Sequence, residues 1–207
     1  MPLIEKYNST LSVLKLWKIS ETEEELFKDL NLSESANLKL NKLKPQQLRK
    51  QFLSVQHLLK ILKIKNEDLH YNKEGKPLFF SKKFISISHS FSYSGIVVSN
   101  NKVGLDIEKV RTKISNIYTK FISDLELKLI AELSIENLTK VWTIKEAVFK
   151  AFGYSGIDFK KNINIESICD KFKKGRVKVF KNEVTEYYTF EIIIFSKYIC
   201  TITKLDQ

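Results

Sequence analysis

The feature that most constrains the fold of this chain is a helical pattern of apolar residues between positions 138 and 152. Side chains recur there every three or four residues, so that one stripe of a helix carries Leu138, Val141, Trp142, Val148, Phe149 and Phe152. Lys145 falls inside this stripe, where an unpaired ammonium group is costly, and we therefore expect an anion close to it. Glu146 and Lys150 lie one turn apart on a flank of the same stripe. The pattern predicts a buried helix with charged groups beside its apolar face.

The alternation of residues 103–108 predicts a short strand. One face of the strand is apolar and the other is not: Val103, Leu105 and Ile107 against Gly104, Asp106 and Glu108. If this strand packs on the helix, Asp106, Glu108 and Glu146 come together. Three carboxylates repel one another unless a cation lies between them, and Mg²⁺ takes oxygen ligands of this kind while sharing them with phosphates.

Two lysines accompany the carboxylates, Lys145 and Lys150. We expect both to hold phosphate groups, in a metal-dependent phosphoryl or phosphodiester transfer. Each part also has a plainer interpretation, because two acids on a strand are often its solvated face and Glu146 with Lys150 is an ordinary helix-surface pair. The lysine inside the apolar stripe favours a site over these interpretations.

The composition is that of a globular protein with an excess of positive charge. The 207 residues are 43% hydrophobic, which suits one large domain or two small ones. The net charge is +11 and the isoelectric point about 9.4. Such a surface favours anionic partners, namely nucleic acid, phosphorylated cofactors, acidic proteins or anionic membranes, although a lysine-rich proteome gives the same excess.

The cysteines and the N-terminus indicate a cytoplasmic protein. Cys169 and Cys200 are far apart and have no metal-ligand spacing, so we expect two buried free thiols in a reducing compartment. The first residues lack a basic start followed by an apolar run, so no signal peptide is expected. The apolar run 192–195 is too short to span a bilayer, and no membrane partner is expected.

The remaining patterns predict an α+β protein in two halves, separated by a turn at residues 100–102. Alternating residues predict strands at 11–19, 84–90, 95–99, 176–181, 187–195 and 197–204. Helices are expected over 21–30 and 45–63, after a capping box formed by Ser123 and Glu126, and from Ser134 to Gly153. Residues 111–122 read as irregular and basic.

Four short motifs, taken together, resemble the 4′-phosphopantetheinyl transferase superfamily, in its surfactin-synthetase-activating type. They are residues 75–77 (GKP), 87–90 (ISHS), 104–108 (GLDIE) and 142–150 (WTIKEAVFK). The resemblance implies a monomeric pseudo-dimer of two similar α+β halves, each a small antiparallel sheet packed with a long helix. Residues 1–100 would contact the phosphates of coenzyme A, and residues 101–207 would carry the metal and the catalytic residues.

The resemblance also implies the reaction and its main residues. The 4′-phosphopantetheine of coenzyme A would pass to a serine of an apo acyl or peptidyl carrier protein, releasing adenosine 3′,5′-bisphosphate. Asp106, Glu108 and Glu146 would hold Mg²⁺ on the pyrophosphate, with Asp106 and Glu146 in the catalytic set. Glu146 would take the proton of the serine, directly or through water, and Lys150 would stabilise charge on the pyrophosphate as the bond breaks.

Further residues match coenzyme-binding positions of the family. Lys76 and His89 would contact the phosphates, with Ser88 beside them. Relatives commonly carry an arginine for the 3′-phosphate where this chain has Gln56, so Arg49 or Lys50 is expected to replace it. The basic residues that follow the acidic strand either steer the carrier protein or form a solvated loop: Lys109, Arg111, Lys113 and Lys120.

Two other functions compete with the transferase. Asp106 followed by Glu126 and Lys128 fits a pattern of Mg²⁺-dependent nucleases, but that pattern needs Glu126 and Lys128 on a strand, pointing together. The capping box predicts a helix instead, on which the two residues lie about 200° apart. A non-catalytic nucleic-acid-binding protein leaves Lys145 unexplained, and no nucleic-acid-binding motif is visible.

Overall fold

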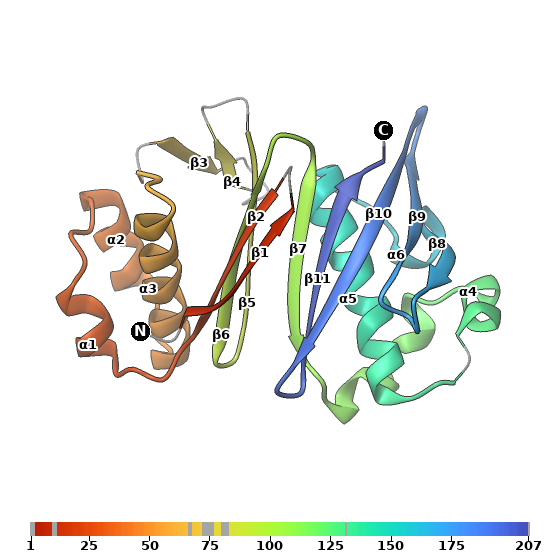
Figure 1. The fold of residues 1–207 in the computed structure, drawn as a ribbon, viewed down its shortest axis with the longest axis horizontal. Helices are drawn as coiled ribbons and strands as arrows, with labels where there is room; N and C mark the ends of the chain where they lie inside the picture. The colour runs from red at the N-terminus through yellow and green to blue at the C-terminus, as the bar shows by residue number, and fades with distance from the viewer. Residues whose placement is uncertain are drawn as a thin grey trace. The chain divides into compact units, whose positions relative to one another are not determined.

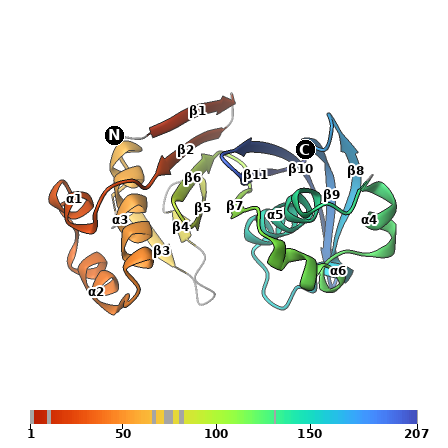
Figure 2. The same ribbon diagram turned by 90° about the horizontal axis from the view of Figure 1, so that it is seen from below.

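The computed structural model describes residues 3–9, 12–65, 68–71, 77–79, 83–130 and 132–206. Its α+β chain divides into two compact units, unit 1 from Met1 to Asn100 and unit 2 from Asn101 to Gln207. Each unit has an antiparallel sheet and one long helix (Figures 1 and 2). The α+β class expected from the sequence is therefore confirmed, whereas a pseudo-dimeric relation between the units stays a prediction.

Unit 1 has a four-stranded antiparallel sheet in the order β1-β2-β6-β5 and a separate pair of short strands, β3 and β4 (Figure 1). The strands are β1 (Leu3–Ser9), β2 (Ser12–Lys18), β3 (Leu69–Tyr71), β4 (Pro77–Phe79), β5 (Phe84–Ser90) and β6 (Tyr93–Ser99). The helices are α1 (Glu23–Lys28), α2 (Glu34–Lys42) and α3 (Gln46–Ile61).

The core of unit 1 lies between α3 and the sheet. Leu53 and Leu58 of α3 are fully buried in one cluster with Trp17, Ile85 and Ile96 of the strands. Burial of this kind is worth about 1.5–3 kcal/mol for each large apolar side chain. The long helix predicted for residues 45–63 is confirmed, and Pro45 is its N-cap. Helix α2 was not predicted, because it buries only Ala36 and Leu40 and its apolar pattern is weak.

Unit 2 has a five-stranded antiparallel sheet in the order β7-β11-β10-β9-β8. The strands are β7 (Val103–Lys109), β8 (Ile163–Cys169), β9 (Lys174–Lys181), β10 (Val184–Phe195) and β11 (Tyr198–Leu205). The helices are α4 (Asp124–Leu129), α5 (Ile135–Phe152) and α6 (Phe159–Asn162), with two 3₁₀ turns, η2 (Thr112–Asn116) and η3 (Tyr118–Lys120).

Helix α5 packs across the sheet of unit 2 through the apolar stripe that the sequence predicts. Leu138, Val141, Val148 and Phe152 are buried in the core cluster, and Trp142 and Phe149 pack against it partly buried. Burial is complete on both faces of β7 as far as Ile107. Strand β8 was not predicted, since only its first residues alternate between buried and exposed positions.

Two other expectations have clear outcomes. The capping box of Ser123 and Glu126 is confirmed at the start of α4. The expectation of two buried thiols is right for Cys200 and wrong for Cys169, which is exposed because it ends β8 at the edge of a turn. Among the described residues, the helices are too short or too polar to cross a membrane.

Candidate active site

Gly104 lets β7 and α5 approach each other closely. A Cβ atom built on Gly104 would lie 1.8 Å from the carbonyl oxygen of Ala147 and 2.9 Å from Oγ1 of Thr203. Any larger residue would therefore push the backbone of α5 away from the strand. The glycine accounts for the close packing that brings the polar face of β7 next to α5.

The two ends of α5 are defined by local signals. Ser134 is the N-cap, and its hydroxyl accepts a hydrogen bond from the backbone N–H of Asn137. Gly153 ends the helix in the left-handed conformation, at φ 78°, which favours glycine. Glu146 and Lys150 consequently lie in the last two turns, where the helix dipole favours the positive charge of Lys150.

Lys150 and Asp106 form an ion pair between α5 and β7. Nζ of Lys150 donates to Oδ1 of Asp106 at 2.6 Å and to the carbonyl oxygen of Leu105 at 3.1 Å. The Asp106 side chain is 6% exposed and the Lys150 side chain 29%. The lysine therefore neutralises a nearly buried carboxylate while part of its own side chain reaches solvent.

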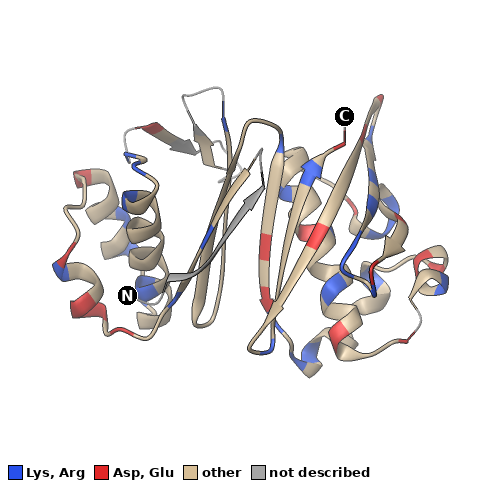
Figure 3. Cartoon of the chain, viewed as in Figure 1, with Lys and Arg blue, Asp and Glu red and all other residues tan. Residues whose placement is uncertain are grey.

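The pKa of Glu146 depends on both carboxylates of the strand. It is raised to about 7, first by burial, then by the negative charge of Asp106, with a smaller contribution from Glu108 and an opposing one from Lys150. Like charges raise the pKa of a carboxyl group only over short distances. The three carboxylates therefore share one electrostatic environment with Lys150 (the acidic residues on β7 are red in Figure 3).

The chemistry of this cluster fits a hard divalent cation. It offers carboxylate oxygens, the ligands that Mg²⁺ prefers, and the negative charges of Asp106 and Glu108 contribute, after burial, to the raised pKa of Glu146. The side chains are not arranged around a common point, because no three His, Cys, Asp or Glu residues in the described part of the chain are placed to hold a metal. The positive charge next to Asp106 is that of Lys150.

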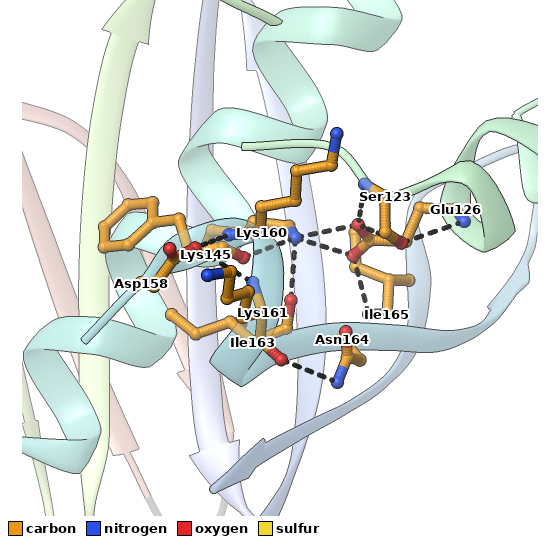
Figure 4. A network of polar contacts seen from close by, with 10 residues as sticks. Ser123, Glu126, Lys145, Asp158, Lys160, Lys161, Ile163, Asn164 and Ile165 are labelled. Carbon is orange, nitrogen blue, oxygen red and sulfur yellow. Dashed lines mark hydrogen bonds and ion pairs between the residues drawn. The ribbon is translucent and has the colours of Figure 1, made fainter. Parts of the chain in front are cut away.

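The expectation that Lys145 holds phosphate is wrong. Its side chain is fully buried, and Nζ donates to Glu126 at 2.8 Å, to the carbonyl oxygen of Phe159 at 2.8 Å and to that of Ile163 at 2.7 Å (Figure 4). An anion does lie next to Lys145, as expected, but it is Glu126. Burial lowers the pKa of Lys145, and the charge of Glu126 opposes that shift.

The same contacts argue against the nuclease interpretation. Glu126 is 2% exposed and belongs to α4, on which Lys128 is exposed. The predicted helix is thus confirmed, and the two side chains do not point together. The sequence indicated Glu126 only as a capping residue; the lysine in an apolar stripe was the available signal that a buried acid must lie nearby.

The residues of unit 1 expected to bind coenzyme A lie in different surroundings. Ser88 is buried and His89 exposed, in keeping with the alternation of side chains along β5, while Lys76 lies outside the described residues. Arg49 donates to Glu23 at 2.7 Å and to the carbonyl oxygens of Leu40 and Leu43 at 2.8 and 3.3 Å. These contacts join α1, α2 and α3 and give no support to a role in phosphate binding.

Gln56, at the position of the family arginine, is buried on α3. It lines a pocket of about 530 Å³ together with Leu59, Lys60 and Ile64, all in unit 1. The contacts of Ser88, His89, Lys76 and Arg49 with a coenzyme stay predictions.

The basic residues after β7 form part of a second pocket, which lies within unit 2. Lys109, Arg111 and Lys113 line this pocket of about 170 Å³ together with Glu108 and Trp142. Lys120 is exposed and is not part of the lining. Positive charge therefore adjoins the carboxylate cluster on the side of Glu108.

Two comparisons with known proteins bear on this site. The chain is 31% identical over 144 residues to the 4′-phosphopantetheinyl transferase gsp of Aneurinibacillus migulanus. This match covers 64% of the present chain and spans 61% of the relative's own length. Residues 102–203, which include β7 and α5, match the family model described as the 4′-phosphopantetheinyl transferase superfamily. The region that carries β7 and α5 is thus similar to the 4′-phosphopantetheinyl transferase superfamily.

Proposed function

We propose that this protein transfers 4′-phosphopantetheine from coenzyme A to a serine of an apo acyl or peptidyl carrier protein and releases adenosine 3′,5′-bisphosphate. The observation that carries the proposal is the cluster of three carboxylates and Lys150 where α5 packs on β7. The family of residues 102–203 supports the same reaction class. The name of the Aneurinibacillus migulanus relative agrees with it.

In this proposal Glu146 accepts the proton of the carrier serine, directly or through water. The serine oxygen attacks the phosphorus that carries the pantetheine arm, and the bond from that phosphorus to the bridging oxygen of the pyrophosphate breaks. In the metal-free protein the pKa of this carboxyl group is about 7, with burial as the largest cause. A carboxylate within hydrogen-bond reach of a hydroxyl can take its proton as a general base.

Lys150 stabilises the negative charge that develops on the leaving phosphate. Its ammonium group already contacts Asp106 at 2.6 Å and retains some exposure to solvent, so an incoming phosphate can compete for it. Asp106, Glu108 and Glu146 would hold a Mg²⁺ ion. When bound, the ion would neutralise the pyrophosphate and withdraw charge from the bond that breaks.

The overall charge of the protein suits both proposed substrates. Coenzyme A is polyanionic and carrier proteins are typically acidic, while this chain carries a net charge of +11. Basic residues are spread over the strands and helices of both units (Figure 3). Lys76, Ser88 and His89 of unit 1 are proposed to contact the coenzyme phosphates. We further propose a cytoplasmic monomer; the two cysteines, which are both free thiols, agree with a reducing compartment.

A mass-shift assay tests the proposal. The protein is incubated with coenzyme A, Mg²⁺ and a panel of apo carrier proteins, and we expect at least one carrier to gain the phosphopantetheine mass. Asp106→Ala and Glu146→Gln should abolish this gain while the fold stays intact. Glu136→Gln is the matched control, because Glu136 is a half-exposed acid on the same helix, in an ion pair with Lys140. No modification of any carrier by the wild-type protein would contradict the proposal.

A further inference from the structure

Lys145 is the most completely buried charged group of α5. The exposed fraction of its side chain is 0%, and that of its partner Glu126 is 3%. Its three N–H groups have three acceptors: the carboxylate of Glu126 and the carbonyl oxygens of Phe159 and Ile163. The proposed reaction makes no use of this lysine.

The partner carboxylate is also held by several hydrogen bonds. One oxygen of Glu126 accepts the backbone N–H of Ile165 at 2.9 Å, and the other accepts the backbone N–H and the hydroxyl of Ser123 at 2.8 and 2.9 Å (Figure 4). The network thus joins the start of α4, the start of β8, helix α6 and the middle of α5. Glu126 cannot move without breaking the cap of α4.

This network acts on α5 at the residue next to Glu146. Successive residues of a helix point about 100° apart, so the direction of the Lys145 side chain sets that of Glu146. Two other contacts flank the same segment: the hydroxyl of Thr143 bonds that of Thr201 on β11 at 2.7 Å, and the backbone of Ala147 lies against Gly104. The backbone around Glu146 is therefore fixed from the sheet side and from the side of α4.

A buried ion pair fixes the orientation of its side chains more reliably than it stabilises the folded state. Taking two charges out of water costs about as much as their attraction returns, and well-packed apolar residues often replace such a pair without loss of stability. An apolar side chain, however, can slide along its neighbours, whereas an ammonium group with three fixed acceptors cannot. The rotation of α5 about its own axis is thereby restricted.

We propose that the Lys145–Glu126 pair positions Glu146 for the transfer reaction. Both members are positioning residues that touch neither the substrate nor the proposed metal. The inference rests on the proposed function for its kinetic test, and on the carboxylate cluster alone for its metal-binding test. We therefore expect that removal of the pair lowers kcat and the metal affinity while the protein still folds.

The experiment uses the double variant Glu126→Gln with Lys145→Met, which removes both charges at similar side-chain volume. Folding is checked by near-ultraviolet circular dichroism, carrier modification is measured as kcat and KM for coenzyme A, and Mn²⁺ binding is measured by electron paramagnetic resonance. We expect a folded protein whose kcat falls by about tenfold or more, because small displacements of a catalytic group have effects of that order. The Mn²⁺ dissociation constant should rise by about tenfold, and KM for coenzyme A should not change.

Lys140→Met is the matched control. It makes the same substitution on the same helix and removes another ion pair, that of Lys140 with Glu136 at 2.9 Å, in the first half of α5. We expect it to keep the kcat and the Mn²⁺ affinity of the wild type even if its melting temperature falls. A folded double variant with wild-type kcat and Mn²⁺ affinity would overturn the proposal.

A second variant tests the proposal if the double variant does not fold. Lys145→Arg keeps the charge, but a planar guanidinium cannot direct its hydrogen bonds to the same three acceptors. Measured at a temperature where it is folded, it should show the same loss of kcat and of Mn²⁺ affinity, and wild-type values would overturn the proposal. If the wild-type protein modifies no carrier, the proposed function is contradicted but the positioning role is not. The Mn²⁺ titration then tests whether the Lys145–Glu126 pair positions Glu146. A wild-type protein that binds no Mn²⁺ would overturn the positioning role as well.

Discussion

The long helices of the two units bury polar groups of different kinds. In α3 they include a hydroxyl and an amide: Ser54 bonds the hydroxyl of Ser94 at 2.8 Å, and Gln51 donates to the carbonyl oxygen of Phe91. Helix α5 buries the ammonium group of Lys145 as well as the hydroxyl of Thr143, and its Glu146 and Lys150 are partly buried. Both helices have about the same length and both pack on an antiparallel sheet. The polar groups named for α3 bond within unit 1, whereas α5 also carries the charged groups of the proposed site.

The difference is also one of cost. The free energy of a neutral hydrogen bond inside a protein slightly exceeds the cost of removing its two groups from water. The net stabilisation is roughly 1 kcal/mol. A buried charge loses far more and needs a partner of opposite sign. Glu146 has a pKa of about 7 because burial and two further carboxylates disfavour its charge, and Lys150 opposes them only in part. The charged form of Glu146 thus lowers the stability of unit 2 at the proposed site.

The largest expected effect is the loss of one partner of the buried pair in α5. Glu126→Ala leaves Lys145 buried without its carboxylate, and removal of one partner of such a pair costs about 3–5 kcal/mol. Urea unfolding followed by circular dichroism measures this loss. A change below about 1 kcal/mol, the scale of an exposed ion pair, would remove the contrast between the two helices.

The next effect concerns the approach of α5 to β7. Gly104→Ala places a Cβ atom 1.8 Å from the carbonyl oxygen of Ala147, so the backbone of the helix must move. We expect a loss of about 3 kcal/mol, at the upper end of the usual cost of overpacking. Thermal unfolding measures the stability, and the carrier assay should show a parallel loss of kcat. An alanine variant with wild-type stability and kcat would show that the close approach is not required.

A pH titration sharpens the comparison at Glu146. The pKa of this carboxyl group is about 7 in the folded protein, against an ordinary value of 4.5. The folded state therefore binds more protons between these values, and stability falls as the pH rises from about 4.5 to 7. Glu146→Gln removes this dependence. Without metal, the free energy of unfolding of the variant should therefore rise relative to that of the wild type by up to about 3 kcal/mol between pH 4.5 and pH 8.

Urea unfolding at several pH values measures this gain, with Glu136→Gln as the control that should follow the wild type. Addition of Mg²⁺ at pH 8 should stabilise the wild type and the Glu136→Gln control equally, whereas Glu146→Gln should respond less. Parallel curves for Glu146→Gln and the wild type would contradict the assigned pKa.

The smallest effect is expected in α3. Ser54→Ala removes the hydroxyl that bonds Ser94, and the loss of a neutral buried hydrogen bond costs about 1 kcal/mol. Thermal unfolding measures it, and the kcat of carrier modification should stay unchanged. A loss as large as that of Glu126→Ala would mean that neutral and charged groups contribute alike.

Much of unit 2 was predictable from local patterns. The alternation of β7 and the apolar stripe of α5 are both present in the structure, because the period of a strand or helix is contained in consecutive residues. Helix α2 and strand β8 escaped prediction, since few of their residues are buried and their patterns are weak. Cys169 was expected to be buried from its residue type alone, and its position at a strand end decided otherwise.

The sequence by itself determined which residues carry charge and which helix and strand present them, since these follow from residue identity and periodicity. The tertiary structure alone decided the partners. It paired Lys145 with Glu126 instead of a phosphate, and Arg49 with Glu23, because a helical pattern sets the direction of a side chain but not what another part of the chain places there. The partner of a buried charge depends on contacts between residues far apart in sequence, and those form only when the elements pack.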